Sequence, residues 1–565
     1  MNPLFLGYDA ADRPIRLGGK DREAHMHVIG SSGSGKSKFL EWMIRGDLAN
    51  RQGFCLIDPH GTLFRDVVSY CAHRVLDREI ILLDLSNPTY VIPFNPFRRA
   101  RRTDISVQVD RRITATMHAW GASNTDETPT LERTLRLIYT TLIEQGLSFL
   151  DAQYLIDFNS RDIRTPLIRN TSSPLIRREW EELQQLKPKD WRAEVLSAKN
   201  RLFRLLTSTN LVRFFSPSAN ALDIGDIIDN GKILLVNLAP SDQLSEENAR
   251  VFGALLVNEL FEAARRRTAE QPKPFYLYVD EFQTFVSLDI TNMLDQVRKF
   301  GLYCVLAHQR FGQLDEDLVD AALNNCQIKA VFGGLSVENA RAMAYELFIG
   351  ELDPKKIKVA IYQTKFWPTY SRDTVHTHSW SEGHSSGRGE NYASSSSSSA
   401  ASGEYFQGSD WFASGYSDVS TRGQSDVRGH HSSETDFVGE MGGTADIPIL
   451  LPVPFKELSN IQFYTPEEQV LELTAGLKEQ FPRHCFIKIH QHKTQPMLVP
   501  FVKKFYMPPE NLTRYNERLL ARAGACPAAE IDNLVLQKSG NEKVTKQRKG
   551  ETPKGPTWTD LVGKE

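Results

Sequence analysis

Short runs of consecutive apolar residues recur along the chain, and each run is followed by polar or helix-forming residues. They occupy residues 25–30, 53–61, 79–85, 231–240, 274–282, 301–309 and 326–334. Continuous apolar runs separated by helical patterns are typical of parallel strands covered by helices on both faces. The pattern therefore predicts an α/β fold with a mainly parallel sheet.

The pattern changes between residues 105 and 225, where helical periodicity dominates and clear strands are absent. Residues 129–146 begin with a proline, repeat apolar positions at helical spacing and end at a glycine. Residues 193–208 follow a similar pattern. We therefore expect an inserted all-α subdomain at 105–225, flanked by the two parts of the sheet domain at 1–104 and 226–371.

The last third of the chain has a different composition. Residues 372–442 are rich in Ser and Gly, a composition that predicts a disordered insert, either a flexible loop or a segment whose aromatic residues bind a partner. Residues 443–510 are expected to contain a β-hairpin and strand segment that rejoins the fold. Residues 511–565 are expected to be a basic, flexible tail.

A glycine-rich turn follows the first apolar run of the sheet domain. Residues 27–40, HVIGSSGSGKSKFL, fit the pattern G-x-x-x-x-G-K-[ST] between a strand and a helix. In such a loop the backbone N–H groups surround a phosphate, the lysine reaches the β- and γ-phosphates, and the hydroxyl binds Mg²⁺. The expected nucleotide-binding residues are Gly30, Ser31, Ser32, Gly33, Ser34, Gly35, Lys36 and Ser37.

Two further runs end in residues suited to nucleotide hydrolysis. The strand at 274–282 ends in Asp280 and Glu281, which we expect to hold the metal and to polarise the attacking water, respectively. Gln309 follows the neighbouring apolar run, where it either senses the γ-phosphate or is an ordinary surface glutamine. Together these residues predict a nucleoside triphosphate hydrolase that uses Mg²⁺.

Composition narrows the class of protein only a little. The formal charge is −3, which leaves room for a basic channel inside a balanced surface. No run of about 18 apolar residues occurs, so we expect no transmembrane segment. The densest basic cluster is either a nucleic-acid contact or a solvated loop, and it contains Arg98, Arg99, Arg101, Arg102, Arg111 and Arg112.

The succession GSSGSGKS, LIDPHG, LERTLRLIYTTLIEQG, ILLVNLAP, LYVDEF and RKFGLYCVLAHQRFGQL resembles the TraD/TraG-like coupling proteins of type IV secretion and conjugation. These belong to the HerA–FtsK group of ring-shaped, DNA-pumping ATPases. The resemblance covers about residues 20–350 and, weakly, 450–505. It implies a RecA-like P-loop NTPase that binds ATP and Mg²⁺, assembles as a homo-hexamer and acts on DNA.

The resemblance also implies roles for single residues. Lys36 and Ser37 match the Walker A lysine and metal-binding serine, and Asp280 and Glu281 match the Walker B pair. Gln309 matches the glutamine that senses the γ-phosphate. Arg298 either matches the arginine that such motors insert into a neighbour's site or is an ordinary solvated cation, and Arg341 is a second candidate for the inserted arginine.

The resemblance has one clear departure, because membrane-bound coupling proteins carry transmembrane helices before the phosphate loop. Here the preceding 29 residues look like a short β-hairpin. We expect a cytoplasmic protein that a membrane-anchored secretion partner recruits to the inner membrane, or a soluble relative with another role in DNA processing.

The leading hypothesis is an ATP-driven translocase that pumps DNA, or a nucleoprotein, through a hexameric ring in conjugative transfer or type IV secretion. One alternative is a nucleotide-switched substrate receptor or assembly platform that does not pump. Another is a HerA-like motor that works with a separate nuclease in DNA processing or phage defence.

Overall fold

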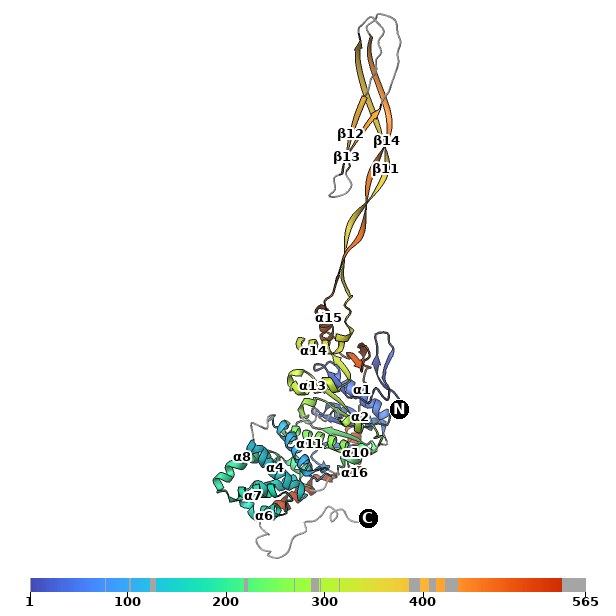
Figure 1. Ribbon diagram of the computed structural model, residues 1–565. Helices are drawn as coiled ribbons and strands as arrows, with labels where there is room; N and C mark the ends of the chain where they lie inside the picture. Colours follow the sequence, from blue (N-terminus) through green and yellow to red (C-terminus); the bar gives the residue numbers. More distant parts are fainter. Residues whose placement is uncertain are drawn as a thin grey trace. The chain divides into compact units, whose positions relative to one another are not determined.

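The computed structural model describes residues 2–76, 78–100, 103–121, 129–217, 222–268, 270–285, 294, 296–314, 316–385, 397–405, 413–421 and 435–540. The chain forms two compact units (Figure 1). The larger unit comprises Met1–Asp353 and Thr465–Glu565, and the smaller unit is Pro354–Tyr464.

An eleven-stranded sheet forms the core of the larger unit, in the order β2-β1-β16-β15-β10-β3-β9-β8-β4-β7-β5. The strands from β10 to β5 are parallel, whereas β15, β16, β1 and β2 extend the sheet in antiparallel register. The predicted α/β fold with a mainly parallel sheet is confirmed. The strands are β1 (Leu4–Tyr8), β2 (Pro14–Leu17), β3 (Met26–Ile29), β4 (Gly53–Asp58), β5 (Ile80–Asp84), β7 (Ile233–Asn237), β8 (Phe275–Val279), β9 (Leu302–His308), β10 (Ile328–Phe332), β15 (His484–Ile489) and β16 (Gln495–Leu498).

Helices connect the parallel strands. Every residue of β4, β7, β8, β9 and β10 is buried, because helices cover the sheet, and this accounts for the continuous apolar runs in the sequence. The helices that follow the parallel strands are α1 (Lys36–Ala49), α2 (Thr62–Arg74), α11 (Glu246–Arg265), α13 (Glu316–Asn325) and α14 (Val337–Phe348).

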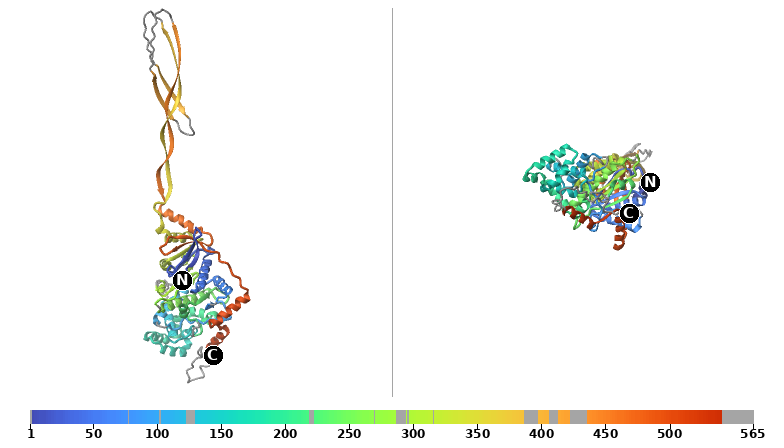
Figure 2. Two further views of the ribbon diagram at one scale, coloured as in Figure 1. Left: turned by 90° about the vertical axis from the view of Figure 1, so that its right-hand side faces the viewer. Right: turned by 90° about the horizontal axis from the view of Figure 1, so that it is seen from below.

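A group of helices lies in the chain between the short strand β6 (Tyr90–Val91) and β7. Their ribbons gather at one end of the larger unit (Figure 2). Helix starts follow local rules: Asp104 caps α3 by accepting from Ser106 N at 2.8 Å, and Pro129 begins α4. The helices are α3 (Ile105–Ala119), α4 (Pro129–Glu144), α5 (Ala152–Ile156), α6 (Arg161–Arg169), α7 (Pro174–Gln185), α8 (Pro188–Leu206), α9 (Thr209–Phe215) and α10 (Ile224–Asn230).

The smaller unit is a long antiparallel hairpin. Strand β11 (Ile357–Ser385) pairs with β14 (Thr435–Phe463), and Figure 1 shows the two strands twisting around each other. In the chain between them, β12 (Ser397–Tyr405) pairs with β13 (Ala413–Thr421). The unit therefore consists of two-stranded ribbons.

This hairpin differs from the disorder that the sequence predicts for residues 372–442. The described parts of that range belong to β11, β12, β13 and β14, and the other parts lie outside the described residues. The prediction rested on the low apolar content of the segment. In an antiparallel pair, the backbone N–H and C=O groups that face the partner strand bond to each other without burying side chains, so composition alone misses this source of order.

Prolines mark one stretch of this ribbon. Pro368 lies opposite Pro452 in the register, and Pro448 and Pro454 lie in the same alternating phase as Pro452. Two facing prolines fit only a non-hydrogen-bonded pair, because a hydrogen-bonded pair would lack both N–H donors. All four missing N–H groups therefore belong to positions that face the outer edges of the ribbon, and on β14 only Leu450 donates outward between residues 448 and 454.

The remaining segments agree with the predicted domains only in the hairpin that rejoins the sheet. Within 443–510, residues up to Phe463 belong to β14, helix α15 (Pro466–Lys478) follows, and the hairpin that joins the sheet is β15–β16. Within 511–565, the structure shows α16 (Pro509–Arg522) and α17 (Ala528–Gly540) where the sequence predicts a flexible tail. Residues 541–565 lie outside the described residues.

The two C-terminal helices are held by packing and by an ion pair. Tyr515, Leu519 and Leu520 of α16 are buried in the main core. Arg213 Nε donates to Asp532 Oδ1 at 2.8 Å and links α9 to α17. A basic composition predicted solvation, but the apolar residues of α16 recur at helical spacing and supply the face that docks.

We predict that Leu519→Ala destabilises the larger unit by about 2–5 kcal/mol, because it removes a buried side chain from the core. Leu519 is 2% exposed, whereas the control Leu536 on α17 is 67% exposed. Thermal or urea unfolding of both variants measures the difference. An unchanged midpoint for Leu519→Ala would show that α16 is undocked in solution.

Candidate nucleotide-binding site

The predicted site residues follow the carboxyl ends of three neighbouring strands. The glycine-rich loop follows β3, Gln309 follows β9, and Asp280 and Glu281 follow β8, in the sheet order β3-β9-β8. Because parallel strands end at the same edge of a sheet, this topology brings the three groups together. The carboxyl edge of a parallel sheet is where α/β proteins bind ligands.

The loop from Gly30 to Gly35 has the backbone that the motif requires. Gly33 and Gly35 have φ angles of 80° and 112°, a left-handed region that favours glycine. A Cβ on Gly30 would lie 2.5 Å from Phe332 Cβ, so the loop passes directly against β10. Ser34 Oγ donates to Ser31 O at 2.8 Å and closes the loop, whereas Ser32 is exposed.

Helix α1 starts at the end of this loop with Lys36. No side chain caps its start, so its first backbone N–H groups remain available to an external acceptor. Lys36 is 6% exposed and, within the described part of the chain, forms no hydrogen bond or ion pair. Burial lowers the pKa of Lys36, and Asp280 and Glu281 partly oppose that effect. A buried ammonium without a paired anion fits a phosphate-binding site.

Ser37 and Asp280 lie together beside Lys36. Ser37 Oγ donates to Asp280 Oδ2 at 3.4 Å. Burial, and then the negative charges of Glu281 and Asp58, raise the pKa of Asp280 to about 6. A hydroxyl and a carboxylate whose charge is poorly compensated fit a magnesium site, since Mg²⁺ takes oxygen ligands and keeps several waters.

The carboxylate of Glu281 is held between two amides. Gln309 Nε2 donates to Glu281 Oε1 at 2.6 Å, and Gln283 Nε2 donates to Glu281 Oε2 at 2.7 Å. Glu281 itself has a φ angle of 48°, a conformation that costs energy for a side chain of this size. The sequence analysis did not select Gln283, because only the short 3₁₀ turn Phe282–Thr284 brings it back to Glu281.

Behind Gln309, two buried histidines join β9 to β3. The Nε2 atoms of His27 and His308 are 2.7 Å apart, and Phe311 contacts both rings. Burial lowers the pKa of both imidazoles, that of His308 to about 3, so both rings are neutral at physiological pH. This pair fixes the strand that carries Gln309 against the strand that carries the phosphate loop.

Arg298 lies at the other edge of the sheet. It is exposed in the 3₁₀ turn Arg298–Phe300, before β9 begins at Leu302. Strand β9 spans seven residues, or about 23 Å, so Arg298 is far from the loop of its own subunit. Arg341 is exposed on α14.

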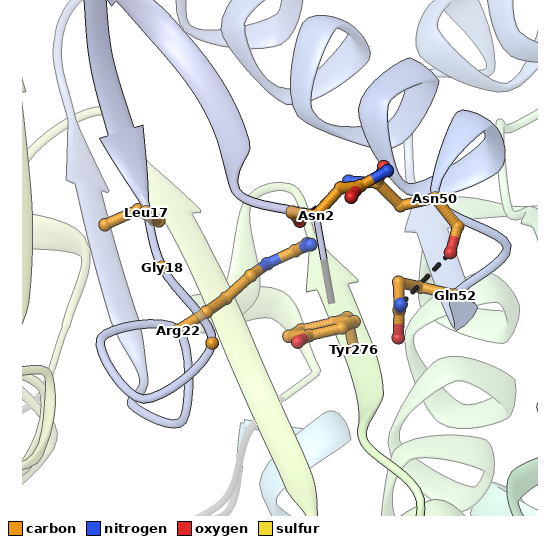
Figure 3. Close-up of a pocket in the computed structure, with 8 residues that line it drawn as sticks. Asn2, Leu17, Gly18, Arg22, Asn50, Gln52 and Tyr276 are labelled. Carbon is orange, nitrogen blue, oxygen red and sulfur yellow. Dashed lines mark hydrogen bonds between the residues drawn. The ribbon is translucent and has the colours of Figure 1, made fainter.

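A small pocket lies near the amino end of β8 rather than at the predicted site (Figure 3). Its only guanidinium, that of Arg22, lies 3.7 Å from the centre of the Tyr276 ring. Arg22 also pairs with Asp47 and donates to Tyr278 at 3.0 Å, so its donors serve the core. The lining residues are Asn2, Leu17, Gly18, Gly19, Arg22, Asn50, Gln52 and Tyr276.

The predicted basic cluster is partly used inside the protein. Arg112 is buried, donates through Nε to Pro96 O at 2.7 Å and pairs with Glu259 of α11. Arg111 lies 3.7 Å from Glu262. These two arginines join α3 to α11, whereas Arg98 and Arg99 are exposed and Arg101 and Arg102 lie outside the described residues.

The mainly parallel sheet and the glycine-rich loop after β3 define a RecA-like P-loop fold. Residues 274–355, which contain β8, β9 and β10, match the family described as the TraM recognition site of TraD and TraG. The predicted resemblance to TraD/TraG-like coupling proteins is thereby confirmed for this segment. The sequence matches no curated protein.

Several solved structures are similar to this chain. The plasmid coupling protein TrwB in complex with the ATP analogue ADPNP is 13% identical, with a TM-score of 0.49 over 87% of this chain and 90% of that chain. TrwB with ADP and Mg²⁺ is 18% identical, with a TM-score of 0.42 over 60% of this chain and 78% of that chain. VirB4 of Thermoanaerobacter pseudethanolicus is 13% identical, with a TM-score of 0.38 over 61% of this chain and 87% of that chain.

In the described parts of the chain, no helix has both the length and the apolar composition that a membrane span requires.

We predict that Asp280→Asn stabilises the nucleotide-free protein, and more so at pH 7.5 than at pH 5. In the folded protein the pKa of Asp280 is about 6, above its ordinary value of 3.8. The folded state therefore holds this proton more tightly than the unfolded state does, and the stability of the wild-type protein falls as the pH rises from about 4 to 6 and above. The variant lacks this loss, and its advantage grows by roughly 1 kcal/mol between pH 5 and 7.5. Urea unfolding at both pH values, without Mg²⁺, measures it. The exposed Glu181→Gln is the control, and equal advantages at the two pH values would contradict the prediction.

Proposed function

We propose that this chain is an ATP-driven DNA translocase that works as a homo-hexameric ring in conjugative transfer or type IV secretion. The observation that carries the proposal is the buried ammonium of Lys36 beside the buried carboxylates of Asp280 and Glu281. Such a charge arrangement is costly in an empty protein and is balanced by a polyphosphate with a divalent cation. The resemblance to TraD/TraG-like proteins supports DNA as the substrate.

Each residue at the carboxyl edge has a role in this proposal. The loop from Gly30 to Gly35 and the start of α1 bind the phosphates through backbone N–H groups, and Lys36 compensates their charge. Ser37 and Asp280 hold Mg²⁺, which neutralises charge on the phosphate oxygens when bound. Glu281 orients and polarises the attacking water, and Gln309 releases Glu281 when a γ-phosphate is present.

The site is completed by a neighbouring subunit in this proposal. Arg298 lies too far from its own phosphate loop to act there, and its exposed position at the opposite edge of the sheet is available to an adjacent copy. An arginine supplied in trans stabilises negative charge in the transition state, and it makes hydrolysis depend on assembly.

The proposal includes protein partners. The matched segment is described as a site at which TraD and TraG recognise TraM, and we extend protein recognition through residues 274–355 to this chain. A membrane-anchored secretion partner then places the ring at the inner membrane. DNA contact is expected to be independent of sequence and sensitive to salt, because it is made to phosphates.

We predict that Glu281→Gln lowers DNA-stimulated ATP hydrolysis by about 100-fold or more and leaves ATP binding intact, since it removes the base and keeps the shape. Steady-state phosphate release with and without DNA, together with ATP binding by calorimetry, measures both properties. The matched control is Glu181→Gln on α7, an exposed carboxylate outside the site. Wild-type hydrolysis that DNA leaves unchanged, together with full activity of Glu281→Gln, would refute the proposed function.

We predict that mixing two inactive variants, Lys36→Ala and Arg298→Ala, restores part of the ATPase activity. The Lys36→Ala subunit supplies an intact arginine to the intact phosphate loop of an adjacent Arg298→Ala subunit. Mixing Lys36→Ala with Glu281→Gln is the negative control. Both residues belong to the part of the site that one subunit supplies, so a mixed ring contains no complete site and stays inactive. Absence of recovery in mixed rings, or recovery with Arg341→Ala in place of Arg298→Ala, would remove Arg298 from this role.

A further inference from the structure

The segment that returns from α15 to the sheet passes directly over the phosphate loop. Arg483 N donates to Ser34 O at 2.9 Å. A Cβ on Gly35 would lie 3.0 Å from the same Arg483 nitrogen. The backbone at residue 483 is therefore in contact with the loop one residue before Lys36.

Both ends of this segment are fixed. Before it, Gly334 N donates to Lys478 O at 2.9 Å and holds the end of α15 beside β10. After it, Val499 N donates to Arg483 O at 2.9 Å, and Arg483 Nε donates to Val499 O at 3.0 Å. Arg483 has a φ angle of 72°, so the turn keeps a costly backbone conformation. Such a turn holds its side chains in one place relative to the phosphate loop.

Two large aromatic side chains are left uncovered, one just before β15 and one just after β16. Phe481 is 76% exposed and Phe501 is 74% exposed. The guanidinium of Arg483 lies 5.7 Å from the centre of the Phe501 ring, and the Phe481 ring lies 6.2 Å from that of His484. Exposed aromatic rings beside a guanidinium on a fixed backbone are typical of a surface that binds a ligand.

We propose that Phe481, Arg483 and Phe501 form a platform for the purine base of the nucleotide whose phosphates bind at residues 30–37. Aromatic rings and guanidinium planes stack on bases, and the energy is independent of hydrogen bonding to the base edge. A nucleoside triphosphate carries its base at the end opposite the γ-phosphate, so a platform next to the loop but away from Asp280 and Glu281 suits the base. The proposal rests on the nucleotide site of the proposed function. It adds a site for the base, because the phosphate-loop motif accounts only for the phosphates.

The test compares ATP with inorganic tripolyphosphate, which has the phosphates and no base. Calorimetry in Mg²⁺, without DNA, gives both affinities for each variant. We expect Phe501→Ala to weaken ATP binding about 10-fold and to leave tripolyphosphate binding unchanged, because base stacking contributes about 1–3 kcal/mol. Phe501→Trp restores ATP binding. Tyr506→Ala is the matched control, since Tyr506 is 82% exposed and, like Phe501, lies between β16 and α16.

Equal weakening of ATP and tripolyphosphate by Phe501→Ala would show that the segment only supports the loop, and would overturn the platform. Unchanged ATP binding by Phe501→Ala would overturn the platform as well. A lower particle mass of this variant, with an unchanged ratio of the ATP and tripolyphosphate affinities, would also overturn it and would assign the aromatic rings to a contact between copies. Failure of the proposed function gives a different result: the wild-type protein binds neither probe, or Lys36→Ala binds both as well as wild type does. Either of these results also removes the platform.

Discussion

The site depends on an ammonium and two carboxylates that the fold buries in one place. Lys36, Asp280 and Glu281 are each at most 6% exposed. Removal from water disfavours the charged form of Lys36 and of Asp280, as the opposite shifts of their pKa values show. The parallel sheet imposes this arrangement because β3 and β8 end at the same edge. In the proposed function, a phosphate chain and a divalent cation relieve both costs at once.

The residues around this cluster keep the two carboxylates apart in function. Asp280 faces Ser37, whereas Glu281 turns away with a left-handed backbone and is held by Gln283 and Gln309. Two amide donors occupy both oxygens of Glu281. In the proposed function, a γ-phosphate attracts Gln309 and frees one of those oxygens to orient water. The two neighbouring acids therefore reach different partners because the backbone reverses between them.

The parallel sheet and the positions of its loops were predictable from the sequence, because buried strands appear as unbroken apolar runs and the phosphate loop has a strict spacing. Gln283 was not predictable, since its contact depends on a short turn after β8 that leaves no periodic pattern. The predicted basic cluster shows a different limit of the sequence. Arg112 is a buried tie to Glu259, and a count of charges along the chain does not distinguish it from a solvated arginine.

Segments with few apolar residues were the hardest to predict. The pairing of β11 with β14 joins residues that are far apart in the chain, from Ser385 opposite Thr435 to Ile357 opposite Phe463, and composition carries no record of it. Helix α16 was missed because its arginines are as numerous as its buried apolar residues, which are Tyr515, Leu519 and Leu520. In both cases order comes from partners distant in sequence, which a local pattern does not reveal.

The prolines of β14 have a consequence for a chain that we propose to work in several copies. A ribbon with open edges is a template on which a strand from another copy can add, and repeated addition leads to fibrils. Between residues 448 and 454 the outer edge of β14 lacks three of its four N–H donors and keeps only its carbonyl acceptors and the N–H of Leu450. A further strand could form only part of a ladder there, which disfavours polymerisation of crowded copies along this edge.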